Sequence, residues 1–366
     1  MGDTKKKQKK GNILNFNINI GGTSLRDKAL LAKHMAVMQQ SGLTIMESLT
    51  IIGESTKGKM KKVINGVKKS VESGNSLSSS FARYPKVFSG IFVSSVYAGE
   101  TSGTLSENLK NLADQLQKEK ELTSKVKGAM LYPAVVLFAA FVLGMAMSFF
   151  VLPKITPLFE GLKTELPITT RGLIAFSHFI NDHGTALFAG IIIFIVALIW
   201  IVKQKFSHPV THWLALKVPI IKKIVYNTNL ARFSRTLGML LQSGLNIDEA
   251  LDVTQKTVNN YYYKKALAEV RDRVSKGTKL ADNLDHYRKL FPKMTSRMIM
   301  VGEQSGKLED TLMYLAGFYE VEVDNSTKSL STAIEPILLL LIGLVVGFLA
   351  LSIITPIYNI TGNINR

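Results

Sequence analysis

Cysteine is absent from the 366 residues of this chain, which excludes disulfide bonds, thiolate zinc sites and a cysteine nucleophile. The six histidines show no HExxH spacing, and the sequence contains neither a GxSxG elbow nor a dinucleotide-binding fingerprint. The GESTKGKM stretch at residues 53–60 resembles a phosphate-binding loop, but it lacks the Ser or Thr after the lysine and no strand precedes it. We therefore predict no enzymatic activity, no cofactor and no defined metal site.

Charged side chains are missing from three long stretches, residues 129–152, 185–202 and 336–356. At about 1.5 Å rise per residue, a helix over each of them is long enough to cross a hydrocarbon core of about 30 Å. The mean hydropathy of +0.17 is high for a soluble protein and agrees with this assignment. The sequence predicts three transmembrane helices, at 129–152, 185–203 and 336–356.

Positive charge is in large excess, with 45 Lys and Arg against 27 Asp and Glu. Lysines precede the first apolar stretch and follow the second, which marks these flanks as cytoplasmic. We expect a basic, flexible cytoplasmic tail at 1–24, an extracytoplasmic loop at 153–184 and an extracytoplasmic tail at 357–366. No aromatic platform accompanies the basic tail, so we expect contact with a lipid membrane and no specific nucleic acid.

A short motif occurs twice, as YAGETSGTL at 97–105 and as MVGEQSGKL at 300–308. The same offset of about 203 residues relates many other positions, and such internal similarity indicates duplication. Capping-box patterns start one helix in each copy, at Thr44–Glu47 and at Asn246–Glu249. Each copy contains short amphipathic helices separated by Ser, Gly and Pro. We predict an all-α membrane protein with two cytoplasmic bundles of five to six helices, at 25–128 and 204–335.

Four carboxylates at repeated positions are candidate contacts for a partner or a cation. Glu100 and Glu303 belong to the repeated motif, where the alternative is a purely structural turn. Glu119 and Glu322 extend a leucine stripe close to the membrane, where the alternative is a solvated group at the end of the bundle. The sequence leaves both alternatives open for each pair.

Small residues also recur at the repeat offset inside two of the predicted membrane helices. Ala140 and Gly144 in the first correspond to Gly343 and Gly347 in the third. Small residues four apart allow helices to approach closely in lipid. We predict that these positions pack against other membrane helices, within the chain or between chains.

The repeated motifs together resemble the inner-membrane platform proteins of type IV pili and type II secretion, the GspF/PilC family. The resemblance rests on Gln40-Ser-Gly-Leu43 and Gln242-Ser-Gly-Leu245, on the two Gly-Glu motifs, and on Pro133 and Pro336 at the span entries. It implies a non-enzymatic, oligomeric protein of the cytoplasmic membrane. Its implied partners are a hexameric assembly ATPase, pilin or pseudopilin subunits and other inner-membrane assembly proteins, and its implied role is to couple the ATPase to insertion of pilin into a fibre.

Two alternative functions remain at this point. A DNA-uptake pseudopilus would use a platform of the same family. A transporter subunit would also explain duplicated halves, but transporters place polar groups at mid-membrane. The stretches 129–152, 185–202 and 336–356 contain no Asp, Glu, Lys, Arg or His.

Overall fold

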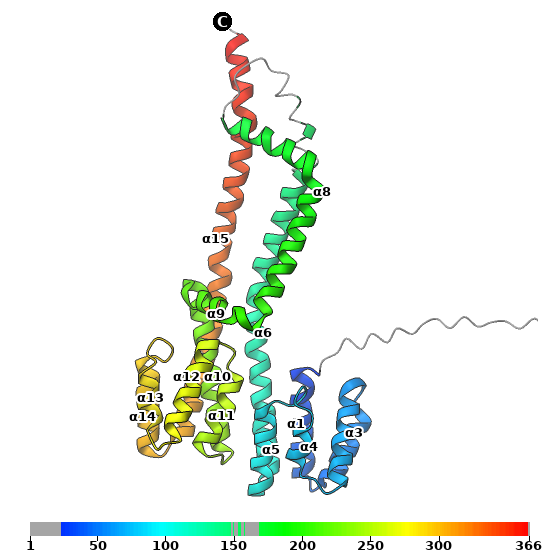
Figure 1. Ribbon diagram of the computed structural model, residues 1–366, viewed down its shortest axis with the longest axis vertical. Helices are drawn as coiled ribbons and strands as arrows, with labels where there is room; N and C mark the ends of the chain where they lie inside the picture. Colours follow the sequence, from blue (N-terminus) through cyan, green and yellow to red (C-terminus); the bar gives the residue numbers. More distant parts are fainter. Residues whose placement is uncertain (1–22, 148, 150–152, 155–156, 158–167, 365–366) are drawn as a thin grey trace, which may run out of the picture. The chain divides into compact units, whose positions relative to one another are not determined.

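The computed structural model describes residues 23–147, 149, 153–154, 157 and 168–364. The tail predicted at 1–24 lies outside these residues up to position 22, as do most of 148–167 and the last two residues. The described residues form helices and turns and contain no strand (Figure 1). This confirms the predicted all-α class. Two compact units, 1–116 and 117–366, are described separately below.

The first unit contains a bundle of short helices and the first turns of a long one. Its helices are α1 (Leu25–Gln40), α2 (Ile45–Ser55), α3 (Gly58–Glu72), α4 (Leu77–Ala82), α5 (Gly90–Ser102) and the start of α6 (Leu105–Ala146). Three fully buried phenylalanines, Phe81, Phe88 and Phe92, contact one another at ring-centre distances of 4.5 to 5.0 Å. Leucines from the α6 stripe, Leu109 and Leu112, close the same core. We call this unit the first bundle.

The second unit repeats this helix order. Its bundle consists of α10 (Pro219–Gln242), α11 (Ile247–Thr257), α12 (Tyr261–Val274), α13 (Leu280–Asp285), α14 (Lys293–Ser305) and the first half of α15 (Leu308–Ile364). Phe233, Tyr263 and Phe291 form its aromatic centre, and the Tyr263 hydroxyl donates to the carbonyl of Leu290 at 2.8 Å. Helices α2–α6 correspond in order to α11–α15, which confirms that the predicted bundle is repeated. We call these helices the second bundle.

The two capping boxes expected from the sequence have different outcomes. Thr44 N–H donates to Glu47 at 2.8 Å, and Glu47 N–H donates to the Thr44 hydroxyl at 3.2 Å, so the first is confirmed. The second is wrong, because the Asn246 side chain makes no capping hydrogen bond. Asp248 and Glu249 in the first turn instead place negative charge at the positive end of the α11 dipole.

Among the residues that the structure describes, three helices are long and apolar enough to cross a membrane. They are α6, the segment Asp182–Val202 of α8 (Ile168–Lys203), and the segment Leu308–Phe348 of α15. Their apolar stretches are almost entirely exposed in the single chain, as lipid-facing surfaces would be. Helix α8 already begins at Ile168, so residues 168–184 of the loop predicted at 153–184 are helical. Helix α15 continues through Pro356 to Ile364.

The prolines at the predicted span entries do not begin new helices. The sequence predicts a membrane helix that begins at residue 129, with Pro133 near its start, where a missing N–H costs little. The helix instead begins at Leu105, and Pro133 lies inside α6. Pro336 likewise lies inside α15. A proline removes one backbone hydrogen bond, and the long uninterrupted helical segments on both sides tolerate that loss. Each bundle therefore continues into a membrane segment through one unbroken helix, α6 of 42 residues and α15 of 57.

Candidate functional site: carboxylates of the repeat and an ion-pair triangle

In the first copy the Gly-Glu-x-Ser-Gly motif forms the last turn of α5 and the glycine that ends it, and each position shared by the two copies has a structural task. Gly103 ends α5 with a φ of +72°, a left-handed conformation that favours glycine. A Cβ added to Gly99 would lie 2.8 Å from the Leu105 Cα, so only glycine permits this approach of α5 to α6. The Ser102 hydroxyl donates to the Ala98 carbonyl at 2.6 Å.

Glu100 caps a different helix of the first bundle. Its carboxylate accepts hydrogen bonds from the backbone N–H groups of Leu77 at 2.5 Å and Ser78 at 2.9 Å, at the start of α4. The next N–H, that of Ser79, donates to the Ser76 hydroxyl at 3.2 Å. A six-residue helix has few bonds of its own, so the carboxylate satisfies donors that would otherwise be unpaired.

Glu303 makes the same arrangement in the second bundle. It accepts from Leu280 N–H at 2.7 Å and from Ala281 N–H at 2.9 Å, at the start of α13. These positions are each 203 residues beyond their counterparts. Both oxygens of each carboxylate are thus engaged within the bundle, which supports the structural alternative for Glu100 and Glu303. Among the described residues no group of three or more potential metal ligands occurs.

We expect Glu100→Gln to destabilise the first bundle by about 1–2 kcal/mol. The amide replaces one of two acceptor oxygens by a donor that faces a backbone N–H, and it removes the charge that strengthens the other bond. Hydrogen exchange of residues 77–82 in the detergent-solubilised chain would measure the loss. Glu54→Gln, an exposed position of the same bundle, is the control. Equal protection of α4 in the two variants would contradict a capping role.

Glu119 and Glu322, which are equivalent by sequence, have different surroundings. The Glu119 carboxylate binds Arg232 through two contacts, Nε to Oε2 at 3.0 Å and an Nη2 to Oε1 contact at 2.6 Å. The Arg232 side chain is only 10% exposed. Glu322 instead lines an open groove of the second unit beside Tyr226. The basic group that contacts Glu119 is therefore a residue of the same chain.

Two further ion pairs join the same helices. Arg235 of α10 pairs with Glu320 of α15, and both side chains are about 15% exposed or less. Lys125 of α6 lies 3.1 Å from Asp324 of α15. We call the three pairs the ion-pair triangle, which consists of Arg232–Glu119, Arg235–Glu320 and Lys125–Asp324. It links α10 to α6, α10 to α15 and α6 to α15, on the bundle side of the membrane segments.

The two arginines of this triangle are not among the site residues predicted from the sequence. They occur three residues apart on α10, in a run whose neighbours Leu230, Phe233 and Leu237 are fully buried. Two charges in an otherwise apolar stripe indicate buried partners, because an unpaired buried charge is costly. That signal is present in the sequence, but the identity of the partners is not.

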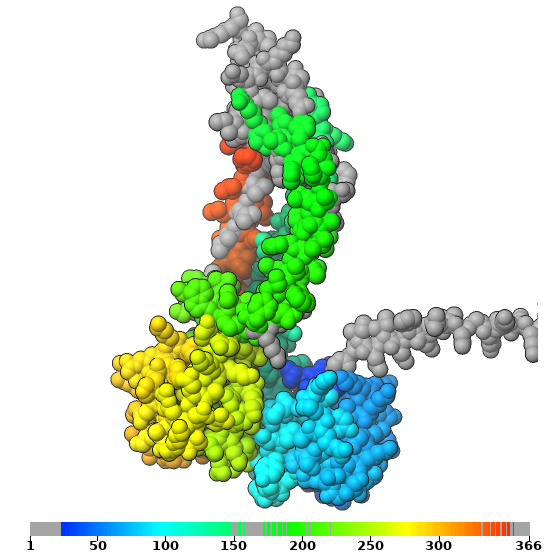
Figure 2. Space-filling view, viewed as in Figure 1, coloured from blue at the N-terminus to red at the C-terminus, as the bar shows by residue number. Residues whose placement is uncertain are grey.

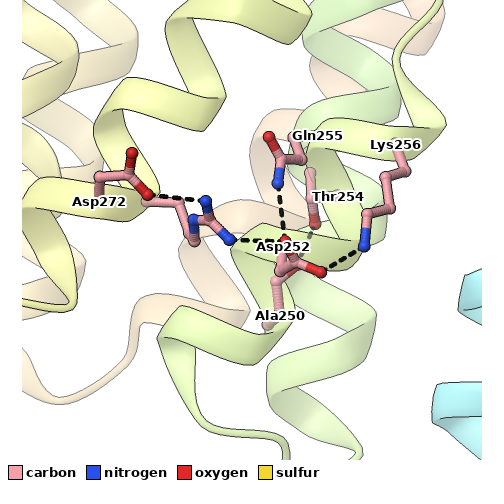
Figure 3. A network of polar contacts seen from close by, with 7 residues as sticks. Ala250, Asp252, Thr254, Gln255, Lys256 and Asp272 are labelled. Carbon is pink, nitrogen blue, oxygen red and sulfur yellow. Dashed lines mark hydrogen bonds and ion pairs between the residues drawn. The ribbon is translucent and has the colours of Figure 1, made fainter.

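A separate polar network ties α11 to α12 in the second bundle (Figure 3). Asp252 accepts from Lys256 at 2.5 Å, from Gln255 at 2.8 Å and from Arg271 at 2.8 Å, and Arg271 also pairs with Asp272. The bond from Lys256, together with the other nearby cations, lowers the pKa of the Asp252 carboxyl and opposes the effect of its partial burial. The position equivalent to Asp252 in the first copy is Thr50, so the duplicated bundles are not chemically equivalent.

The predicted small-residue positions lie on open faces of the membrane helices. A Cβ added to Gly144, Gly343 or Gly347 would meet no other atom within 4 Å in the part of the chain that the structure describes. Ala140 is half-buried. Packing of these positions against other membrane helices, within the chain or between chains, stays a prediction.

These features define an integral membrane protein in which a duplicated helical bundle continues into membrane helices. The sequence matches the family described as type II secretion system protein F twice, over residues 31–153 and 233–356. The chain belongs to this family, as its motifs indicated.

Curated relatives include proteins of both pilus and secretion systems. The chain is 35% identical to the type IV pilus assembly protein PilC of Thermus thermophilus over 349 residues, which covers 94% of this chain and 85% of that protein. It is 32% identical to PilC of Myxococcus xanthus, with coverages of 98% and 87%. It is also 32% identical to the type II secretion system protein F of Aeromonas hydrophila, with coverages of 94% and 89%.

Proposed function

We propose that this chain is the inner-membrane platform of a type IV pilus or type II secretion machine. In this role its bundles face the cytoplasm and contact a hexameric assembly ATPase, while its membrane helices pass the resulting motion to pilin or pseudopilin subunits. The observation that carries the proposal is the continuity of α6 and α15, each of which runs from a bundle into a membrane segment without a break. A continuous helix transmits displacement of a bundle to the membrane.

The ion-pair triangle connects the helices through which motion of the bundles would reach the membrane segments. Helix α10 connects through α9 (His208–Lys217) to α8, so the three helices of the triangle lead to all three candidate membrane segments. A displacement of α10 would therefore move α6 and α15 together. The relatives named as pilus assembly and secretion proteins support the machine class.

The open faces at Gly144 and Gly343 support a homo-oligomer, because such surfaces permit close helix contact between chains. A DNA-uptake pseudopilus remains an alternative within the same mechanism. A transporter is disfavoured, since the apolar stretches 129–152, 185–202 and 336–356 contain no Asp, Glu, Lys, Arg or His that would line an ion path.

The test is affinity purification of the full chain from membranes that also contain the assembly ATPase and pilin of the same cell. We expect both proteins to be recovered with the wild-type chain. In the Arg235→Met variant we expect the ATPase to be retained while the number of fibres falls, because binding persists and coupling is lost. Recovery of neither partner, although both are present in the membranes, would contradict the platform function.

A further inference from the structure

The chain turns sharply where the second membrane segment ends. The Ser207 hydroxyl lies within hydrogen-bond distance of two carbonyl acceptors, that of Ile201 in the last turn of α8 at 2.6 Å and that of Gln204 just after α8 at 2.9 Å. Helix α9 starts at the next residue, His208, after a single turn of 3-10 helix, η2 (Lys205–Ser207). The preceding membrane segment ends at Val202, so the chain that joins it to the start of α9 spans only about 10–15 Å. Helix α9 therefore begins close to the membrane boundary.

Helix α9 exposes an apolar face. None of its ten residues is buried. Val210, Trp213 and Leu214 are 67%, 48% and 55% exposed, and their spacing of three and four places them on one side of the helix. Phe206, just ahead of the helix, is 73% exposed. A helix of this kind beside a membrane segment has the features of one that lies in the interface, where tryptophan is enriched.

This helix is fixed to the second bundle on its other side. The Tyr261 N–H donates to His212 Nδ1 at 3.0 Å, and the Tyr262 hydroxyl donates to the Pro209 carbonyl at 3.1 Å. Burial, and then the neighbouring His208, lowers the pKa of His212 and so favours the neutral ring that can accept. In Figure 2 the light-green segment that contains α9 lies directly on the yellow and yellow-green bundle. Its exposed face is thus held in place.

A positively charged groove of about 1550 Å³ opens beside α9. Lys217, Lys222, Lys223 and Lys289 line it together with an Arg288–Asp285 pair and Glu322. The Lys217 ammonium lies 4.6 Å from the centre of the Trp213 ring. The groove therefore combines several cations with aromatic and aliphatic surface.

We propose that α9 and this groove form a binding site for the headgroup of an anionic phospholipid in the leaflet on the bundle side. In this arrangement Val210, Trp213 and Leu214 enter the acyl boundary, and the groove lysines contact the phosphate. The inference goes beyond the platform function and does not depend on it. It assigns the second bundle a fixed position against the membrane surface.

A lipid fits the observations better than an acidic protein segment. The groove shares Trp213 with the exposed apolar face, and α9 follows the end of a membrane segment closely in the chain, so both parts of an amphipathic ligand have a place. An acidic peptide would satisfy the lysines but would leave Val210 and Leu214 uncovered. Each lysine near an anionic surface favours binding by roughly fivefold, so several together give a marked preference.

The two tryptophans of the chain permit a direct test. In a Trp200→Phe variant of the full chain, Trp213 is the only tryptophan. This variant is reconstituted in phosphatidylcholine vesicles that contain a minor fraction of brominated phosphatidylglycerol or, separately, the same fraction of brominated phosphatidylcholine. We expect Trp213 fluorescence to be quenched by both lipids, and several-fold more strongly by the anionic one. Adding the substitutions K222Q, K223Q and K289Q should remove most of that preference, so that the two lipids quench Trp213 to nearly the same extent.

The matched control removes the same charge from the first bundle, through K59Q, K61Q and K62Q, which are exposed lysines of α3. Retention of the preference in this control, with its loss in the groove variant, supports the site. Equal loss in both variants would mean general charge attraction and would overturn it, as would equal quenching by the two lipids. Absence of quenching, with a Trp213 emission shift on addition of polyglutamate to the solubilised chain, would assign the groove to an acidic protein and also overturn it.

Discussion

Gly99→Val is expected to destabilise the first bundle by about 3 kcal/mol or more. The Cβ alone would lie 2.8 Å from the Cα of Leu105 and 3.1 Å from the Cβ of Asn108. The first of these atoms belongs to the backbone of α6 and cannot move without displacing the helix. Valine adds two methyl groups to this contact, so α5 and α6 must separate and the core leucines behind them lose packing.

The second copy of the motif provides a graded comparison. A Cβ on Gly302 would meet the Thr311 hydroxyl oxygen at 2.7 Å and the Leu308 Cα at 3.1 Å. The closer atom is the end of a side chain, which can rotate away. We therefore expect Gly302→Ala to cost less than Gly99→Ala, although alanine gains up to about 1 kcal/mol of helix propensity at both positions.

Thermal unfolding of the detergent-solubilised chain, with hydrogen exchange of residues 90–116 as the local readout, would measure these effects. Gly90→Ala is the control, because a Cβ at this position meets no atom within 4 Å. It should leave the first bundle unchanged or slightly more stable. If Gly99→Val and Gly90→Ala gave the same protection, the close approach at Gly99 would not be what makes glycine necessary there.

Local signals in the sequence were sufficient to predict the architecture. Uncharged stretches indicated the membrane helices, and Ser-Gly breaks together with the repeat offset indicated two bundles with the same helix order. The Thr44–Glu47 capping box could be predicted because both partners lie within one turn. The Pro133 prediction failed because a proline reports one lost hydrogen bond, whereas helix continuity depends on the segments on both sides.

The tasks of the four carboxylates could not be derived from the sequence. Glu100 binds backbone N–H groups 22 and 23 residues away, and backbone atoms leave no signature in a pattern of side chains. Glu119 binds an arginine 113 residues away, whose counterpart in the first copy is Leu30. The repeat suggested that Glu119 and Glu322 act alike. Of these two glutamates, Glu119 contacts Arg232 of α10, whereas Glu322 lines the groove. The two copies therefore differ at the arginine position, and sequence equivalence of the glutamates does not give them the same partner.

Glu119→Gln should lower the stability of the second unit by about 2–3 kcal/mol, because it leaves the Arg232 guanidinium nearly buried without a counter-charge. Breaking a fully buried pair costs roughly 3–5 kcal/mol, and the 26% exposure of Glu119 reduces that figure. Arg232→Met should cost less, since a carboxylate at this exposure regains water. The double variant should cost less than the sum of the two, which indicates direct coupling.

Glu121→Gln is the matched control two residues along the same helix. Glu121 pairs with Lys118 at 3.4 Å, and both side chains are more than 40% exposed, so we expect a loss within about 0.5 kcal/mol. Thermal unfolding in detergent is measured for the wild-type chain, the two single variants and the double variant, which complete the double-mutant cycle, and for the Glu121→Gln control. A Glu119→Gln chain as stable as the Glu121→Gln chain would show that the pair contributes nothing. A measured coupling would show that this ion pair links α6 to α10 energetically, which the proposed transmission from bundle to membrane requires.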